Sequence, residues 1–199
     1  MENQPSNRDS QLNVFIGFNG TGKSTLIQKN IDVEVNVRDG RALIVTPDPF
    51  EWKQYPEIDL RDPDCFCKIS EPTKLVYAPG DLNKIADQYK GFFNGLLIFD
   101  DCRCYMKANV QEALRTLVIR RRQRSHDIIA AGHGFTEIPP VFFTYSNRYA
   151  LFYTQDNVDR RKEEIGSSFL FVKKAVEDVN KMYSKNPHYC KIIKARNNG

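Results

Sequence analysis

Gly17-Phe18-Asn19-Gly20-Thr21-Gly22-Lys23-Ser24 matches the pattern G-x-x-x-x-G-K-[ST] at every specified position. In this pattern the glycines let backbone N–H groups turn inward around phosphates, the lysine reaches the β and γ phosphates, and the hydroxyl residue ligates Mg²⁺. We therefore predict that the stretch binds ATP with Mg²⁺, and that Ser24 is a metal ligand. The predicted nucleotide-binding residues are Gly17, Phe18, Asn19, Gly20, Thr21, Gly22, Lys23, Ser24 and Thr25. The alternative is a glycine-rich turn that binds nothing.

The segments on either side of this loop fit a phosphate-binding role. An apolar run at residues 12–16 precedes it, and residues 24–27 are suited to opening a helix. A strand, a loop and a helix in this order aim the helix N-terminus at the phosphates. Apolar residues between 26 and 37 fit one helical face, but every second residue from 31 to 37 is also apolar, as in a strand. We favour a helix to about residue 36, because a phosphate loop leads into one.

Length and composition indicate one soluble globular domain. The chain has 199 residues, 41% of them hydrophobic, and no apolar run approaches the ~18 residues of a membrane span. The first residues lack a basic region followed by an apolar one, so we expect no secretion signal. We predict a flexible tail at residues 1–11 and a single domain at residues 12–199. A net charge of +4 neither indicates nor opposes a nucleic-acid partner.

The cysteines indicate a reducing compartment, the cytoplasm. The chain has five of them, an odd number without a secretory context. Four form two C-x-C pairs, Cys65 with Cys67 and Cys102 with Cys104. Two such pairs offer four thiolates to zinc, but structural zinc sites usually space their ligands as C-x₂₋₄-C. We therefore favour buried or idle thiols over a zinc site.

Apolar strands alternate with amphipathic helices along the rest of the chain. Strands are predicted at residues 41–46, 75–77, 95–101, 127–131, 149–153 and 189–193, and helices at 81–89, about 110–118 and 167–183. Residues 47–73 are rich in Pro, Asp and aromatics, and long irregular stretches of this kind are often functional. The alternation predicts an α/β fold of three layers, with a mostly parallel central sheet covered by helices on both faces.

Two adjacent carboxylates end one of the buried strands. Asp100 and Asp101 follow the run Gly95-Leu96-Leu97-Ile98-Phe99. Ligands of parallel α/β folds bind beyond the carboxyl ends of the strands. A carboxylate there holds the Mg²⁺ of Mg-ATP, and its neighbour orients a water for attack on the γ phosphate. We assign Asp100 to the metal and Asp101 to water activation, against the alternative of a solvated strand end.

His133 lies after the strand at 127–131, within Gly132-His133-Gly134. Its strand should end at the same edge of the sheet as the phosphate loop. We predict that His133 senses the γ phosphate or positions the attacking water. The alternative is a loop histidine with a backbone partner.

The strongest cluster of charge consists of Arg120, Arg121, Arg122 and Arg124. On a helix only Arg120 and Arg124 share a face, so the four cannot all serve one site. Arg122 and Arg124 are candidates for an arginine finger that reaches the ATP of a neighbouring subunit, and Arg148 is another. For each of them the alternative is a solvated side chain.

The order of these pieces resembles the FtsK–HerA superfamily of DNA-pumping ATPases, a branch of the P-loop NTPases with a RecA/ASCE-like fold. The resemblance covers residues 12 to about 165. It rests on the loop at 17–24, the strand at 96–101, the basic segment and strand at 120–131, and the segment Asn147-Arg148-Tyr149-Ala150-Leu151-Phe152. In size and lack of attachments the chain is most similar to viral genome-packaging ATPases, with Zot-like phage assembly proteins second.

The resemblance implies a hexameric or pentameric ring that hydrolyses ATP between subunits and moves double-stranded DNA. It also implies a host-cytoplasmic or virion-associated location, and capsid or portal-vertex proteins as further partners. Two positions depart from the family pattern: Asp101 stands where the family usually has Glu, and His133 where it usually has Gln or Asn. Zot-like proteins carry a transmembrane segment, whose absence here favours packaging over extrusion.

Other classes remain open at this stage. A related extrusion, conjugation or segregation motor would share the same motifs. A small-molecule or nucleoside kinase would share the phosphate loop, although no arginine-rich lid follows the central strands. A nucleotide-binding subunit that does not hydrolyse ATP is the third class.

Overall fold

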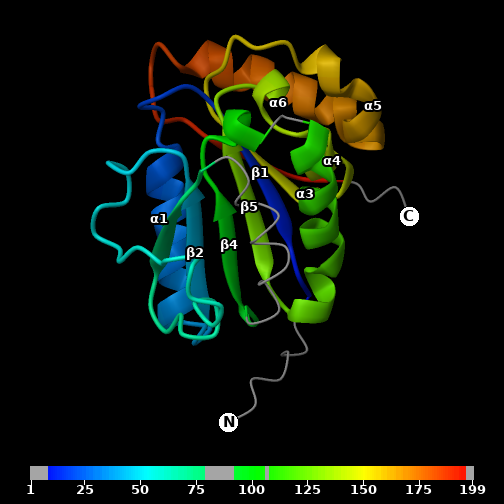
Figure 1. Ribbon diagram of the computed structural model, residues 1–199. Coiled ribbons are helices and arrows are strands. Elements are labelled where there is room, and N and C mark those ends of the chain that lie inside the picture. The colour runs from blue at the N-terminus through cyan, green and yellow to red at the C-terminus, as the bar shows by residue number, and fades with distance from the viewer. Residues whose placement is uncertain (1–8, 79–91, 106–107, 196–199) are drawn as a thin grey trace.

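A seven-stranded sheet runs through the middle of the computed structural model, which describes residues 9–78, 92–105 and 108–195. The strands lie in the order β3-β2-β4-β5-β1-β6-β7 (Figure 1). Their bounds are Leu12–Ile16 (β1), Arg41–Thr46 (β2), Thr73–Val76 (β3), Gly95–Phe99 (β4), Asp127–Gly132 (β5), Arg148–Leu151 (β6) and Lys191–Lys194 (β7). All neighbouring strands pair in parallel except β6 and β7, which are antiparallel. The predicted mostly parallel sheet is confirmed.

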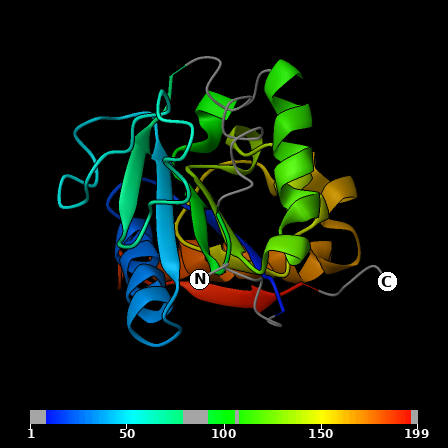
Figure 2. The ribbon, with the colours of Figure 1, turned by 60° about the horizontal axis from the view of Figure 1, so that its bottom comes forward.

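Helices cover both faces of this sheet. The α-helices of the described residues are Lys23–Asn36 (α1), Ala108–Arg120 (α3), Pro140–Thr144 (α4), Lys162–Ile165 (α5) and Phe169–Met182 (α6). Figures 1 and 2 both show the central strands between α1 on one side and α3 on the other. Short 3₁₀ turns occupy Cys102–Tyr105, Arg122–Arg124, Phe135–Glu137, Val158–Arg161 and Gly166–Ser168.

The two sides of the sheet contribute to two apolar cores. Because side chains alternate along a strand, Val14 and Ile16 of β1 pack on one side and Phe15 on the other. The core on the Phe15 side contains Ile27 and Ile31 of α1. The opposite core is larger and contains residues of α3, α4 and α6. Strands buried on both faces explain the continuous apolar runs in the sequence.

Within the described residues, the predicted elements agree with the structure apart from their ends. The helix after the phosphate loop ends at Asn36, as predicted, so the strand alternative for residues 31–37 is wrong. The helical reading of the arginine cluster is also wrong, because α3 ends at Arg120 and a separate 3₁₀ turn, Arg122–Arg124, follows. Arg120 and Arg124 therefore share no helical face.

Some predictions fall outside the described residues. The helix predicted at residues 81–89 is one of them, and so is most of the tail predicted at residues 1–11. Within that tail, the Ser10 hydroxyl donates to the carbonyl of Arg121 at 3.1 Å, and the Gln11 N–H donates to the Asp127 carboxylate at 2.7 Å. Among the described helices, none has the length and apolar character that a membrane crossing requires.

Candidate active site at the carboxyl edge of the sheet

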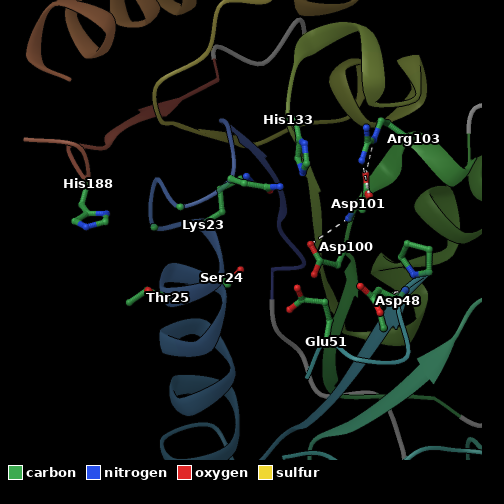
Figure 3. A pocket seen from close by; sticks show the side chains of 15 residues that line it. Lys23, Ser24, Thr25, Asp48, Glu51, Asp100, Asp101, Arg103, His133 and His188 are labelled. Carbon is green, nitrogen blue, oxygen red and sulfur yellow. Dashed lines mark hydrogen bonds and ion pairs between the residues drawn. The ribbon is translucent and has the colours of Figure 1, made fainter. Parts of the chain in front are cut away.

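A cavity of about 440 Å³ opens where the carboxyl ends of β2, β4 and β5 approach the loop between β1 and α1. Figure 3 shows the N-terminal turn of α1 on one side of it, and Asp48, Glu51 and Asp100 on the other. The cavity is lined by Asn19, Gly20, Gly22, Lys23, Ser24, Thr25, Thr46, Pro47, Asp48, Glu51, Asp100, Asp101, Arg103, His133 and His188. Most of the predicted nucleotide-binding residues thus line one cavity with both aspartates and the histidine.

Glycine is needed at several positions of the phosphate loop. Gly20 and Gly22 have φ angles of 74° and 105°, in the region that side chains rarely adopt. At Gly17 the reason is space, because an added Cβ would lie 2.4 Å from the Cβ of Phe152. Gly17, Phe18 and Thr21 do not line the cavity but hold the loop in shape. The Thr21 hydroxyl donates to the carbonyl of Phe18 at 2.7 Å, and the Phe18 N–H donates to Tyr153 O at 2.9 Å.

Lys23 is the first residue of α1, and its side chain turns back to the loop. Its side chain is buried, and its ammonium donates to the carbonyl oxygens of Gly17 and Phe18. Burial lowers the pKa of Lys23 from 10.5 to about 8, although the charges of Asp100, Asp101 and Glu137 oppose this change. Because burial disfavours the charged ammonium, a nearby anion such as a phosphate group would stabilise it.

Asp100 follows β4 and is held in place on two sides. The indole N–H of Trp52 donates to its Oδ2 at 2.8 Å, and the backbone N–H of Asp101 donates to its Oδ1 at 3.1 Å. Trp52 comes from the loop after β2 and is buried. This contact joins the loop to the end of β4.

Asp101 is bound by an arginine. The Arg103 guanidinium donates to both Asp101 carboxylate oxygens, each at 3.0 Å, and this hydrogen bonding lowers the pKa of Asp101. Asp101 also has a φ angle of 46°, which turns the chain sharply at the strand end. Arg103 lies 3.7 Å from Oε2 of Glu137, a buried oxygen without a hydrogen-bond partner among the described residues.

His133 lies at the end of β5 and is half-buried on the cavity wall. Burial and the nearby ammonium of Lys23 lower its pKa, so the imidazole is neutral near pH 7. The backbone carbonyl of His133 accepts a hydrogen bond from the Thr154 hydroxyl at 3.1 Å. This bond holds the backbone at His133, and the ring lies on the cavity wall (Figure 3).

Ser24 and Asp100 offer oxygen donors from opposite sides of the cavity (Figure 3). Oxygen donors suit Mg²⁺, which usually takes one or two protein ligands and completes its shell with water and substrate phosphates. The donor chemistry therefore fits the metal that the sequence motif implies. Within the described part of the chain, no cluster of three or more His, Cys, Asp or Glu side chains is arranged to hold a metal ion.

The three arginines predicted as fingers lie away from this cavity. Arg122 and Arg124 precede β5, and Arg148 begins β6, so all three lie at the amino ends of the strands. The Arg124 guanidinium stacks 4.6 Å from the centre of the Phe93 ring. A contact with ATP bound to the same chain is thus ruled out by topology. A contact with the ATP of a neighbouring subunit stays a prediction.

Sequence reasoning missed several residues of the cavity wall, namely Thr46, Pro47, Asp48, Glu51, Arg103 and His188. The first four belong to β2 and the loop after it, whose composition marked it only as an irregular stretch. Arg103 was detectable as a charge two residues beyond the aspartate pair. His188 comes from the segment before β7, and no local pattern connected it to the phosphate loop.

Several solved structures similar to this one are viral genome-packaging NTPases. The genome packaging NTPase B204 from Sulfolobus turreted icosahedral virus 2 in complex with AMP has a TM-score of 0.67 and 14% identity, over 94% of this chain and 93% of that chain. Its complex with ATP-gammaS has a TM-score of 0.67 and 16% identity, over 93% and 92%. The DNA-packaging ATPase B204 from Sulfolobus turreted icosahedral virus has a TM-score of 0.64 and 17% identity, over 96% and 100%.

Other comparisons add little. The N-terminal domain of zonular occludens toxin from Neisseria meningitidis has a TM-score of 0.45 and 12% identity, over 74% of this chain and 79% of that chain, too low to carry an argument. No protein-family model matches the sequence, and no curated protein does either. The suspected resemblance is thus confirmed at the level of the fold: the chain has the three-layer α/β fold of P-loop ATPases, and its structure is similar to viral genome-packaging NTPases.

Proposed function

We propose that this protein is an ATPase that moves double-stranded DNA, and that it packages a viral genome. The observation that carries the ATPase proposal is the convergence of the phosphate loop, the buried Lys23 and the carboxylate of Asp100 on one cavity. The similarity of the protein's fold to NTPases solved with AMP and with ATP-gammaS supports a nucleotide as the ligand. The role of those viral NTPases in genome packaging supports the proposal that this protein packages DNA.

We assign the residues of the cavity to different roles in hydrolysis. Backbone N–H groups of the glycine loop and the ammonium of Lys23 bind the phosphates and orient the γ phosphate. Ser24 and Asp100 would hold Mg²⁺, which when bound offsets the charge of the phosphates. His133, which also lines the cavity, would hydrogen-bond the γ phosphate or the attacking water. The net products are ADP and phosphate.

ATP hydrolysis with and without duplex DNA tests this proposal, with particle size measured in the same samples. We expect turnover that rises with DNA and falls by roughly a hundredfold in Lys23→Ala. Lys29→Ala is the matched control, because Lys29 is exposed on the same helix and does not line the cavity. Absence of hydrolysis under every DNA condition contradicts the proposal.

A ring of subunits, hexameric or pentameric, would bring an arginine of one chain to the ATP of the next. Arg148 is the stronger finger candidate, because it is exposed at the start of β6. In mixing experiments, we expect Arg148→Ala and Lys23→Ala chains each to be inactive, and to regain activity together where an intact Lys23 meets an intact Arg148. The same test applies to Arg124→Ala. Arginine variants that hydrolyse ATP normally on their own, with no gain in activity on mixing with Lys23→Ala, rule out a finger.

The remaining parts of the proposal concern place and partners. Arginines at the amino edge of the sheet, Arg122 among them, are candidates for contact with DNA phosphates, and such contacts weaken as salt rises. The working location is the host cytoplasm or the virion, with capsid or portal-vertex proteins as partners. Co-purification of the protein with capsid components tests the last of these.

A further inference from the structure

Four carboxylates line the cavity, and three of them are already engaged. Asp48 accepts a hydrogen bond from the N–H of Phe50 at 2.8 Å, and Asp100 and Asp101 are held as described above. The fourth belongs to Glu51, whose carboxylate has no hydrogen bond or ion pair with any other described residue. Figure 3 shows this carboxylate pointing into the cavity beside Asp100.

The turn that carries Glu51 is anchored to the protein interior. Lys74 of β3 is buried, and its ammonium donates to the backbone carbonyls of Pro49 at 2.8 Å and Glu51 at 3.3 Å. On the other side, the neighbouring Trp52 is buried and bonded to Asp100. The backbone of Glu51 is therefore held next to the predicted metal ligand, while its carboxylate bonds to no other residue in the described part of the chain.

Asp101, to which the sequence pattern assigns water activation, is less suited to that role in this geometry. Both of its carboxylate oxygens accept hydrogen bonds from the Arg103 guanidinium, each at 3.0 Å. A general base must have a free oxygen within hydrogen-bond reach of the proton it removes. Figure 3 shows the Asp101 carboxylate directed toward Arg103.

We propose that Glu51 is the catalytic base that activates water for ATP hydrolysis. This inference rests on the proposed ATPase function. The water oxygen forms a bond to the γ phosphorus as the bond between that phosphorus and the β–γ bridging oxygen breaks. Glu51 accepts a proton from the water, the bridging oxygen leaves with ADP, and the proton is then released to the phosphate or to solvent. Asp101, with Arg103, instead shapes the end of β4.

The test compares Glu51→Gln with the native protein in ATP binding and in hydrolysis with DNA. Because the glutamine is nearly isosteric and the residue is exposed, the fold should be unchanged. We expect ATP affinity within about threefold of native and a fall in kcat of roughly a hundredfold or more. Glu71→Gln, an exposed carboxylate of the same long loop outside the cavity, is the matched control and should hydrolyse ATP normally.

A second variant separates a chemical role from a structural one. Glu51→Ala should be equally slow, and added formate should restore at least part of its turnover by supplying a carboxylate in the vacated space. A merely structural role would give no such rescue. Native hydrolysis with a Glu51→Gln rate within fivefold of it overturns the role of Glu51 and leaves the ATPase proposal standing. A native protein that binds ATP but never hydrolyses it overturns both.

Discussion

Replacing Lys23 with methionine should change how stability depends on pH, not only remove activity. In the folded protein the pKa of Lys23 is lowered by burial from 10.5 to about 8. That difference corresponds to about 3.4 kcal/mol, at about 1.4 kcal/mol for each tenfold change in proton affinity. It measures the cost of keeping the ammonium charged in the folded state without a bound phosphate.

The sign follows from proton binding. Below about pH 8 both folded and unfolded chains carry the proton, so the full cost is present. Between pH 8 and 10.5 the unfolded chain is protonated and the folded chain is not, so the free energy of unfolding rises with pH. Relative to Lys23→Met, the native protein should therefore gain about 3 kcal/mol across this window. Above pH 10.5 the difference is constant again.

Urea unfolding of the native protein and Lys23→Met, from pH 7 to 10.5, measures this difference. The two proteins share all other titrating groups, so the contribution of those groups to the pH dependence cancels in the difference between the two unfolding free energies. Bound phosphate should favour the charged ammonium, so ATP binding near pH 8.5 should take up a fraction of a proton in the native protein alone. Calorimetry in two buffers of different ionisation enthalpy detects that uptake. Parallel stability curves together with no proton uptake would refute the reasoning.

Three further substitutions test contacts around the cavity. Trp52→Phe removes the hydrogen bond to Asp100, so it should lower the free energy of unfolding in urea by about 1.5–3 kcal/mol and slow hydrolysis. An unchanged free energy of unfolding would show that this bond contributes nothing to stability. Gly17→Ala forces a Cβ against Phe152, which should cost about 1–3 kcal/mol and weaken ATP binding, and normal affinity would contradict it. Lys74→Met frees the turn at Glu51, so kcat should fall about tenfold with ATP affinity unchanged, whereas equal kinetics would show that the anchor is not needed.

Local patterns predicted the phosphate loop and most of the strands because the relevant physics is local. Glycine torsions, a lysine at a fixed spacing and continuous apolar runs are visible in short windows. The same local patterns wrongly predicted one helix through the arginine cluster, because nothing in these residues indicated that α3 ends at Arg120. The position of His133 near the phosphate loop was predicted from topology, because the carboxyl ends of parallel strands lie at one edge of the sheet.

Contacts between distant segments were not predictable in this way. Trp52 and Asp100 are 48 residues apart, and their hydrogen bond depends on the pairing of β2 with β4. The capture of Asp101 by Arg103 involves near neighbours, but it depends on the positive φ at Asp101, which the residue type does not reveal.

The sequence alone determined that the chain has a phosphate-binding loop and a parallel sheet, because both follow from residue types at fixed short spacings. Only the tertiary structure decided which carboxylates face the cavity and which are occupied. Packing of the loop after β2 against the end of β4 leaves the Glu51 carboxylate beside Asp100, without a bond to another described residue. Side-chain direction at such a junction is set by contacts between segments that are distant in the chain.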